Sequence, residues 1–258
     1  MFEVPTDLYE FAYIHAPDER LKQLAIMAEP EDWEPLEAPD RRPMAVLKSY
    51  IKYTFARLAE EGKVILSDDG AYYVFNTGLV TPNQEAIFAL FDRNQNDGQQ
   101  VWHFLKWCKR YDLVNFSELP GITHYFDDPS KLVLNMSKEL RVNIDHIVSE
   151  NKTRFPEPFN SMDDYTLQTF LKGAIDNAKE RVCRNYKAAV PQYHRGKVQL
   201  LLPLCITNPA KADLALVVED HGSFYRASTC LTLDMAYNNA RLLARPDKDW
   251  LRPNEGRA

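Results

Sequence analysis

The sequence predicts an α+β fold: an antiparallel or mixed sheet of about six strands with helices packed on it. The first observation is three apolar runs in the last third of the chain, at 198–206, 213–219 and 224–233. Turn-forming residues separate these runs, which is typical of central strands. The second is helical spacing of apolar residues in 43–61 and 163–189, which predicts two long helices.

The remaining elements follow from shorter signals in chain order. Short helices are predicted at 17–28, 138–150 and 234–244, and short strands at 84–92, 101–107 and 131–134. The helix at 43–61 is followed by a predicted hairpin, whose strands at 64–66 and 71–79 flank the turn cluster at 67–70. This order is that of a winged helix or of an ordinary helix and hairpin, and both interpretations stay open.

The pattern predicts one main domain. We expect residues 1–42 to form an N-terminal arm and linker, because four prolines punctuate the stretch 30–43. We expect residues 43–258 to form a single α+β domain without an internal repeat.

Composition excludes several classes of function. The 258 residues carry a formal net charge of −6, unlike a protein that coats nucleic acid. The nine glycines form neither a dinucleotide fingerprint nor a P-loop, and the zinc-protease and nucleophile-elbow motifs are absent. The four cysteines have no CxxC spacing, which favours a reducing compartment. We therefore expect a cytoplasmic protein without a membrane segment, cofactor or metal ion.

The first candidate site is a polar stripe on the C-terminal helix. Asp234, Asn238, Arg241 and Arg245 are spaced i, i+4, i+7 and i+11, which places them on one helix face. Two guanidinium groups at this spacing suit recognition of phosphate or carboxylate. Surface salt bridges that match the helix dipole explain the same spacing equally well.

Further candidates lie on the predicted helix 138–150 and at one strand end. Asn143, His146, Asn151 and Arg154 fall close to one helix face or just past its end, and histidine is the usual proton-transfer group near neutral pH. Dipole stabilisation at the helix end is the alternative. Asn76 precedes a glycine at a strand end, where backbone N–H groups bind an anion or the chain forms a β-bulge.

Several stretches resemble a known family. The run at 231–251, LTLDMAYNNARLLARPDKDWL, resembles the C-terminal signature of a bacterial domain family of unknown function. Weaker similarities lie at 75–79, 125–132, 143–156 and 189–193. The resemblance implies that the segments after about residue 43 form one domain, and it implies an association with RNA-related bacterial proteins. It implies no reaction, cofactor or catalytic residue.

These observations favour binding of a nucleotide or an RNA end, with phosphoester hydrolysis as an open question. In this hypothesis Arg241 and Arg245 hold a phosphate, His146 acts as general acid or base, and Asp234 positions an arginine. Asn76, Asn143, Asn151, Arg154 and Asn238 complete the ligand contacts.

Two alternatives stay open. One is a non-catalytic module for single-stranded RNA or other nucleic acid that uses the possible winged helix at 43–80. The lack of a run of Lys and Arg counts against it, and the exception is the stretch 106–110, which has three basic residues among aromatic residues. The other is a protein-interaction module, which predicts an exposed apolar patch.

Overall fold

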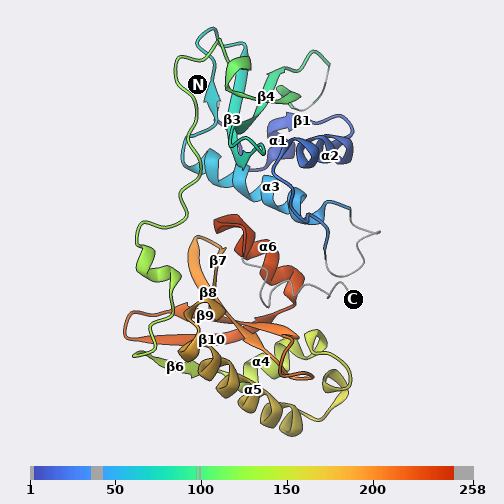
Figure 1. Cartoon of the computed structure of the whole chain (residues 1–258). Coiled ribbons are helices and arrows are strands. Elements are labelled where there is room, and N and C mark those ends of the chain that lie inside the picture. Colours follow the sequence, from blue (N-terminus) through green and yellow to red (C-terminus); the bar gives the residue numbers. More distant parts are fainter. Residues whose placement is uncertain (1–2, 36–42, 97, 99, 247–258) are drawn as a thin grey trace. The chain divides into compact units, whose positions relative to one another are not determined.

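The structure is a computed structural model that describes residues 3–35, 43–96, 98 and 100–246. The chain forms two compact units, Met1–His124 and Tyr125–Ala258 (Figure 1). Each unit has its own sheet, its own helices and its own core, so we describe them one after the other.

Unit 1 is built on a five-stranded sheet with the strand order β1-β5-β4-β3-β2. Strand β1 is parallel to β5, and the other neighbours are antiparallel. The elements are α1 (Leu8–Phe11), β1 (Ala12–Tyr13), α2 (Pro17–Met27), α3 (Ala45–Glu60), β2 (Ile65–Leu66), β3 (Tyr72–Val80), β4 (Ala86–Arg93), β5 (Trp102–Cys108) and the 3₁₀ turn η2 (Arg110–Asp112).

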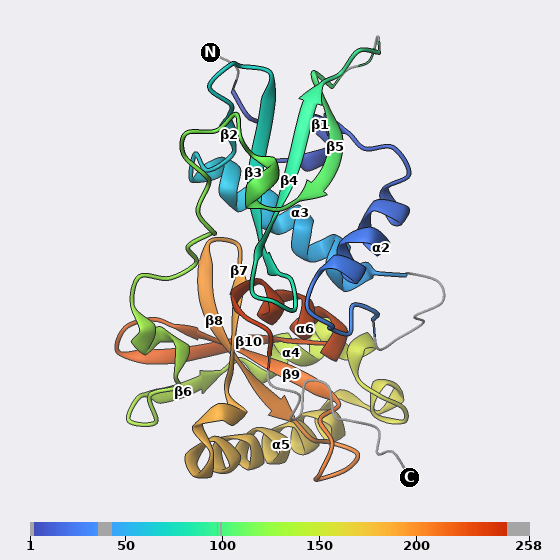
Figure 2. The ribbon, with the colours of Figure 1, turned by 45° about the horizontal axis from the view of Figure 1, so that its top comes forward.

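Both faces of this sheet are buried because β4 is apolar at almost every position. On the face that carries α3, rings of Phe11, Phe55 and Phe91 pack with centroid distances of 5.2 Å. The opposite face carries a smaller core around Phe88 and Leu113, which the chain after β5 covers. Figure 2 shows β3 and β4 running across α3.

The N-terminal segment differs from the predicted arm. Strand β1 pairs with β5, and Leu8, Phe11 and Leu24 are buried in the core of unit 1. The four prolines lie in the stretch between α2, which ends at Met27, and α3, which begins at Ala45. Part of that predicted linker, 36–42, lies outside the described residues.

Unit 2 contains a second five-stranded sheet, with the order β6-β10-β9-β8-β7. Strand β6 is parallel to β10, and the other neighbours are antiparallel. The elements are η3 (Pro129–Leu132), β6 (Glu139–Val142), α4 (Ile144–Asn151), η4 (Lys152–Arg154), η5 (Phe159–Ser161), α5 (Asp164–Arg184), η6 (Tyr186–Ala188), β7 (Val190–His194), β8 (Lys197–Leu204), β9 (Leu214–Asp220), β10 (Phe224–Leu231) and α6 (Leu233–Leu243).

The helices of unit 2 cover opposite faces of its sheet (Figure 1). Helices α4 and α5 bury Ile147 and Leu171 against alternate residues of β8 and β9, such as Leu202 and Leu216. Helix α6 contacts β7, β9 and β10, and its buried residues do not belong to that core. Because strand side chains alternate between faces, α6 lies on the other side of the sheet.

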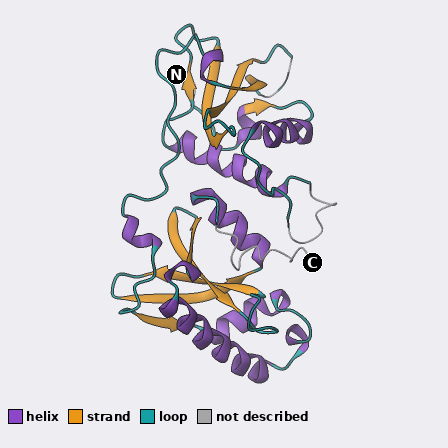
Figure 3. Ribbon diagram, viewed as in Figure 1, coloured by secondary structure: helices purple, strands orange, loops and turns teal. Residues whose placement is uncertain are grey.

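The two units have the same order and direction of strands. In each, a short first strand is followed by helices and then by a four-stranded antiparallel meander, whose last strand pairs in parallel with the first (Figure 3). In each, the chain after the meander crosses the face opposite the helices. The sequence predicts no internal repeat, and this repetition is one of topology.

The α+β prediction is confirmed, with two five-stranded sheets in place of one sheet of about six strands. The winged helix is not confirmed, because the hairpin β2–β3 continues into the larger sheet. The single domain expected at 43–258 spans the boundary between the two units.

Three predicted elements differ. The predicted helix 138–150 begins with strand β6, and helix α4 starts only after Asn143. The first half of the predicted strand 131–134 lies in the 3₁₀ turn η3. Helix α5 ends at Arg184, before the predicted end at 189, and strand β7 was not predicted. Edge strand β6 has only four residues, too few for its alternation of polar and apolar residues to stand out, and edge strand β7 contains a proline.

Candidate functional site

Two predicted ligand-binding residues form hydrogen bonds with strand β10. The Asn151 side chain is buried, and its Oδ1 accepts hydrogen bonds from the Cys230 N–H and the Thr229 hydroxyl, both at 2.8 Å. The Arg154 guanidinium donates to the carbonyl oxygen of Cys230. These bonds satisfy the N–H and the carbonyl of Cys230, which lies beyond the last residue of β10 that pairs with β6. Both side chains therefore have a structural role here.

The other two residues of this cluster lie at the start of α4. Asn143 is the N-cap residue, and its Oδ1 accepts a hydrogen bond of 3.2 Å from the His146 N–H. The His146 side chain is exposed on the helix surface. Asn143 therefore explains where the helix begins, and His146 stands apart from the Asn151 network.

The polar stripe on α6 is only partly a helix face. Helix α6 ends at Leu243, so Arg245 follows the helix and is exposed. Arg241 is only 8% exposed, and Asp234 and Asn238 are half-buried. The Asn238 Oδ1 is buried and has no hydrogen-bond partner within the described chain. Next to it, Asn239 donates to the buried side chain of Gln192 on β7 at 3.1 Å.

The structure does not bring the two proposed catalytic residues together. His146 is on α4 and Asp234 is on α6, and these helices cover opposite faces of the sheet (Figure 1). A proton donor and its positioning group must meet at one reacting atom.

Asn76 lies in unit 1 and stabilises a β-bulge. The β3–β4 register shifts between Asn76 and Val80. The Asn76 Oδ1 accepts a hydrogen bond from the Gly78 N–H at 3.0 Å, and its amide donates to the Pro120 carbonyl at 3.3 Å. Gly78 has a φ of +73°, which glycine adopts readily. The bulge is the alternative that the sequence left open at this position.

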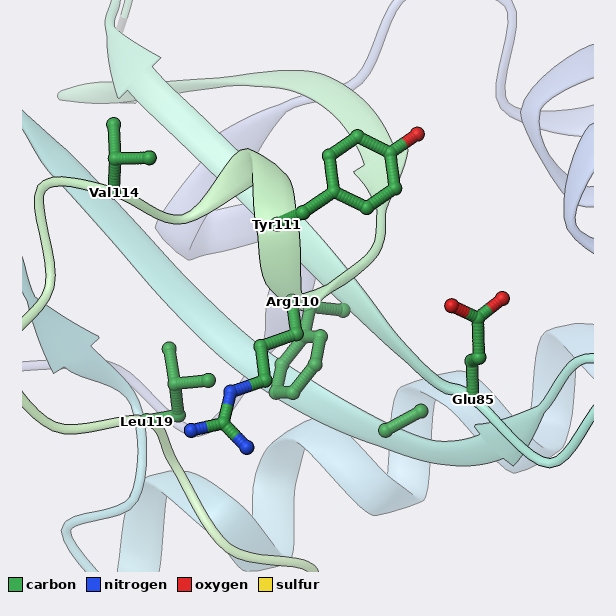
Figure 4. Close-up of a pocket in the computed structure, with 7 residues that line it drawn as sticks. Glu85, Arg110, Tyr111, Val114 and Leu119 are labelled. Carbon is green, nitrogen blue, oxygen red and sulfur yellow. The ribbon is translucent and has the colours of Figure 1, made fainter.

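A pocket of about 670 Å³ opens on the face of unit 1 opposite α3 (Figure 4). Its floor is apolar and comes from β4 and the chain after η2, while η2 supplies polar and aromatic groups. The lining residues are Glu85, Ala86, Phe88, Arg110, Tyr111, Val114 and Leu119. This volume lies in the usual range for small-molecule sites.

Of the two charged side chains that line the pocket, one has an ion-pair partner and the other has none among the described residues. The Glu85 carboxylate is paired with the Lys109 ammonium group. The Arg110 guanidinium forms no ion pair or side-chain hydrogen bond with the part of the chain that the structure describes. Figure 4 shows Arg110 on the Leu119 side of the pocket and Glu85 on the other side. An anionic ligand group would therefore meet a free cation at one side only.

The turn η2 that carries Arg110 is fixed by one carboxylate. Asp112 accepts hydrogen bonds from the Lys106 ammonium group at 2.7 Å and from the Lys109 N–H at 3.1 Å. The bond from Lys106 is the main cause that lowers the pKa of Asp112, and burial opposes it. The turn is therefore held by an ionised carboxylate at neutral pH.

Comparison with known proteins adds a family. The model of a family described as "Domain of unknown function (DUF3825)" matches residues 24–250, which is most of the chain and includes parts of both units. The chain belongs to the DUF3825 family. No curated protein and no solved structure matches it.

The match accounts for part of the resemblance seen in the sequence. A family of unknown function is confirmed, and it begins at residue 24, before the domain start that we expected. The bacterial origin and the association with RNA-related proteins stay predictions.

The cysteines of the DUF3825 chain are free thiols. Burial raises the pKa of Cys108 and of Cys230 to about 12, so neither thiol ionises near neutral pH. Among the described residues, no three metal-binding side chains come together. No described helix has the length and apolar character needed to cross a bilayer.

The sequence did not predict the unit 1 pocket, although one of the stretches singled out there contains a residue that lines it. The basic stretch 106–110 supported one alternative function, and it ends at Arg110. Tyr111 follows directly and is 73% exposed. An exposed aromatic residue next to an arginine was the available signal, and only the fold shows that Phe88 lies beneath them.

Proposed function

We propose that the DUF3825 chain binds a nucleotide or an RNA end in the pocket of unit 1. The observation that carries this proposal is the Arg110 guanidinium, which has no partner among the described residues and stands beside an apolar, partly aromatic hollow. A ligand that suits both features combines an anionic group with a flat apolar body.

A nucleotide has this combination. Its base would lie over Phe88 and Leu119, where stacking on aromatic and apolar side chains is favourable. Its phosphate would accept hydrogen bonds from Arg110, whose planar fork suits phosphate oxygens. Glu85, on the other side of the pocket, would accept hydrogen bonds from an amino group of the base.

The topology of the units supports this choice of surface. The pocket lies where the chain after the unit 1 meander crosses the open face of the sheet, and α6 has this position in unit 2. The stripe of Asp234, Asn238 and Arg241 therefore occupies the corresponding surface in the second unit. Hydrolysis by His146 and Asp234 stays a prediction from sequence, and no part of this proposal depends on it.

The test is calorimetric titration of the full chain with AMP, GMP and a short single-stranded RNA. Arg110→Gln should weaken binding by about tenfold or more, because charge-assisted hydrogen bonds contribute about 1.5–3 kcal/mol. Arg184→Gln is the matched control, since Arg184 is an exposed arginine of unit 2. Equal affinity in wild type and Arg110→Gln, or no binding by wild type, would refute the proposal.

A protein-interaction function is the second candidate. Tyr111, Val114 and Ile122 are 73%, 85% and 54% exposed, within twelve residues of one another. Exposed apolar groups at this density suit a protein partner. If the chain binds no nucleotide but Val114→Asp abolishes capture of a specific protein, this function replaces the first.

A further inference from the structure

The shared topology allows one cross-strand row to be compared between the units. In unit 1, Tyr13 of β1 pairs with His103 of β5, which pairs with Asp92 of β4. In unit 2, Arg141 of β6 pairs with Arg226 of β10, which pairs with Glu219 of β9. Both rows join the first, last and next-to-last strands of their sheets.

In the unit 1 row, the three side chains interact with one another. The His103 Nδ1 lies 3.0 Å from the Asp92 Oδ1, and the Tyr13 ring stacks on the imidazole at 6.1 Å. The fold therefore does not require two like charges in this row.

The unit 2 row places two arginine residues opposite each other on neighbouring strands. Arg226 is exposed and has no ion pair or side-chain hydrogen bond within the described residues. Its neighbour Glu219 is occupied by the Lys197 ammonium group and faces the His221 imidazole at 3.7 Å. Like charges opposite each other on neighbouring strands are destabilising, so an anion between Arg141 and Arg226 would relieve their repulsion.

An aromatic ring lies beside this pair. The Arg141 guanidinium carbon is 4.1 Å from the centroid of the Phe224 ring, and the His221 ring stacks on Phe224 at 5.4 Å and 8°. The carboxylate partner of Arg141 is Glu139, at 2.8 Å, and both side chains of that pair are more than half exposed. Exposed pairs of this kind are weak, so Arg141 can exchange its partner for a ligand.

We propose that Arg141 and Arg226 form a phosphate-binding site on the sheet of unit 2, with the Phe224 ring as its apolar wall. The two forks would hold separate oxygens of one phosphate group. The phosphate belongs to a free anion, a nucleotide or a nucleic-acid backbone. This site is separate from the pocket of unit 1 and does not depend on the function proposed there.

The experiment measures stability and binding on the same variants of the full chain. Without phosphate, Arg226→Gln should raise the urea midpoint of unit 2, because it removes the repulsion from Arg141. Calorimetric titration then uses three probes: inorganic phosphate, AMP and a uridine octamer. Arg226→Gln should bind at least one of them about tenfold more weakly than wild type does. The arm that responds identifies the source of the phosphate.

Arg184→Gln serves as the control, because Arg184 is exposed in the same unit and has an exposed carboxylate partner. It should leave phosphate binding unchanged. If Arg226→Gln lowers the urea midpoint, Arg226 is held by Glu219 and the proposal is overturned. Unchanged binding of all three probes would overturn it as well. Arg110→Gln should leave binding at the Arg141–Arg226 site unchanged. The two proposals can therefore fail independently of each other.

Discussion

At position 78 the fold accommodates only glycine. The Tyr50 hydroxyl donates to the Thr77 carbonyl at 2.9 Å and crosses directly over this glycine. A Cβ added at Gly78 would lie 2.7 Å from the Tyr50 oxygen, and the φ of +73° is strained for any L-residue.

We therefore expect Gly78→Ala to lower the free energy of unfolding of unit 1 by about 2–3 kcal/mol. Gly70→Ala is the control, because Gly70 has a similar φ of +70° with no atom near its Cβ position. It should lose only about 1–2 kcal/mol. Urea unfolding measures both, and equal losses would show that the Tyr50 contact contributes nothing.

Asparagine alone does not distinguish a structural role from a ligand-binding role in this chain. Asn76, Asn143 and Asn151 were all candidates, and the structure gives each a backbone group to satisfy. An amide side chain that supports a bulge, a cap or a strand end has the same sequence signal as one that binds a ligand.

At the scale of elements, η2 couples pH to the unit 1 pocket. The pKa of Asp112 is lowered from 3.8, so its contribution to stability is present above that value and is lost as the pH falls through the lower folded pKa. Asp112→Asn should therefore destabilise unit 1 by about 1 kcal/mol at pH 7 and weaken nucleotide binding.

The stability difference between wild type and Asp112→Asn should vanish in strong acid, because wild-type Asp112 is then neutral as well. Urea unfolding over a pH series checks this. A difference that stays constant down to the lowest pH would mean that the carboxylate does not hold the turn.

The elements with strong periodicity were predicted, and the edge elements were not. Strands β8, β9 and β10 and helices α2, α3 and α6 lie within about three residues of their predicted ends. Strand β6 was merged with α4, since its four residues, ELRV, are too short a run for their alternation of polar and apolar residues to stand out from the helix that follows. The Phe88 pocket could not be predicted, because it depends on how the chain after β5 returns over the sheet.

At the scale of the whole molecule, the repeated topology predicts two autonomous folding units. Each has its own buried core, and neither sheet takes a strand from the other unit. A fragment of residues 125–258 should fold alone, because its aliphatic core lies entirely within that range. Its ¹H–¹⁵N spectrum should be well dispersed, and a collapsed spectrum would show that the unit needs residues 1–124.

The hydrogen bonds of Asn151 and Arg154 have a consequence for self-association. Strand β6 ends at Val142, while β10 continues to Leu231, so an unprotected edge would follow the last β6 partner. The two side chains occupy the N–H and the carbonyl of Cys230 on that edge. A strand from another copy of the chain therefore has no free backbone group to pair with at Cys230, and β10 is guarded against aggregation there.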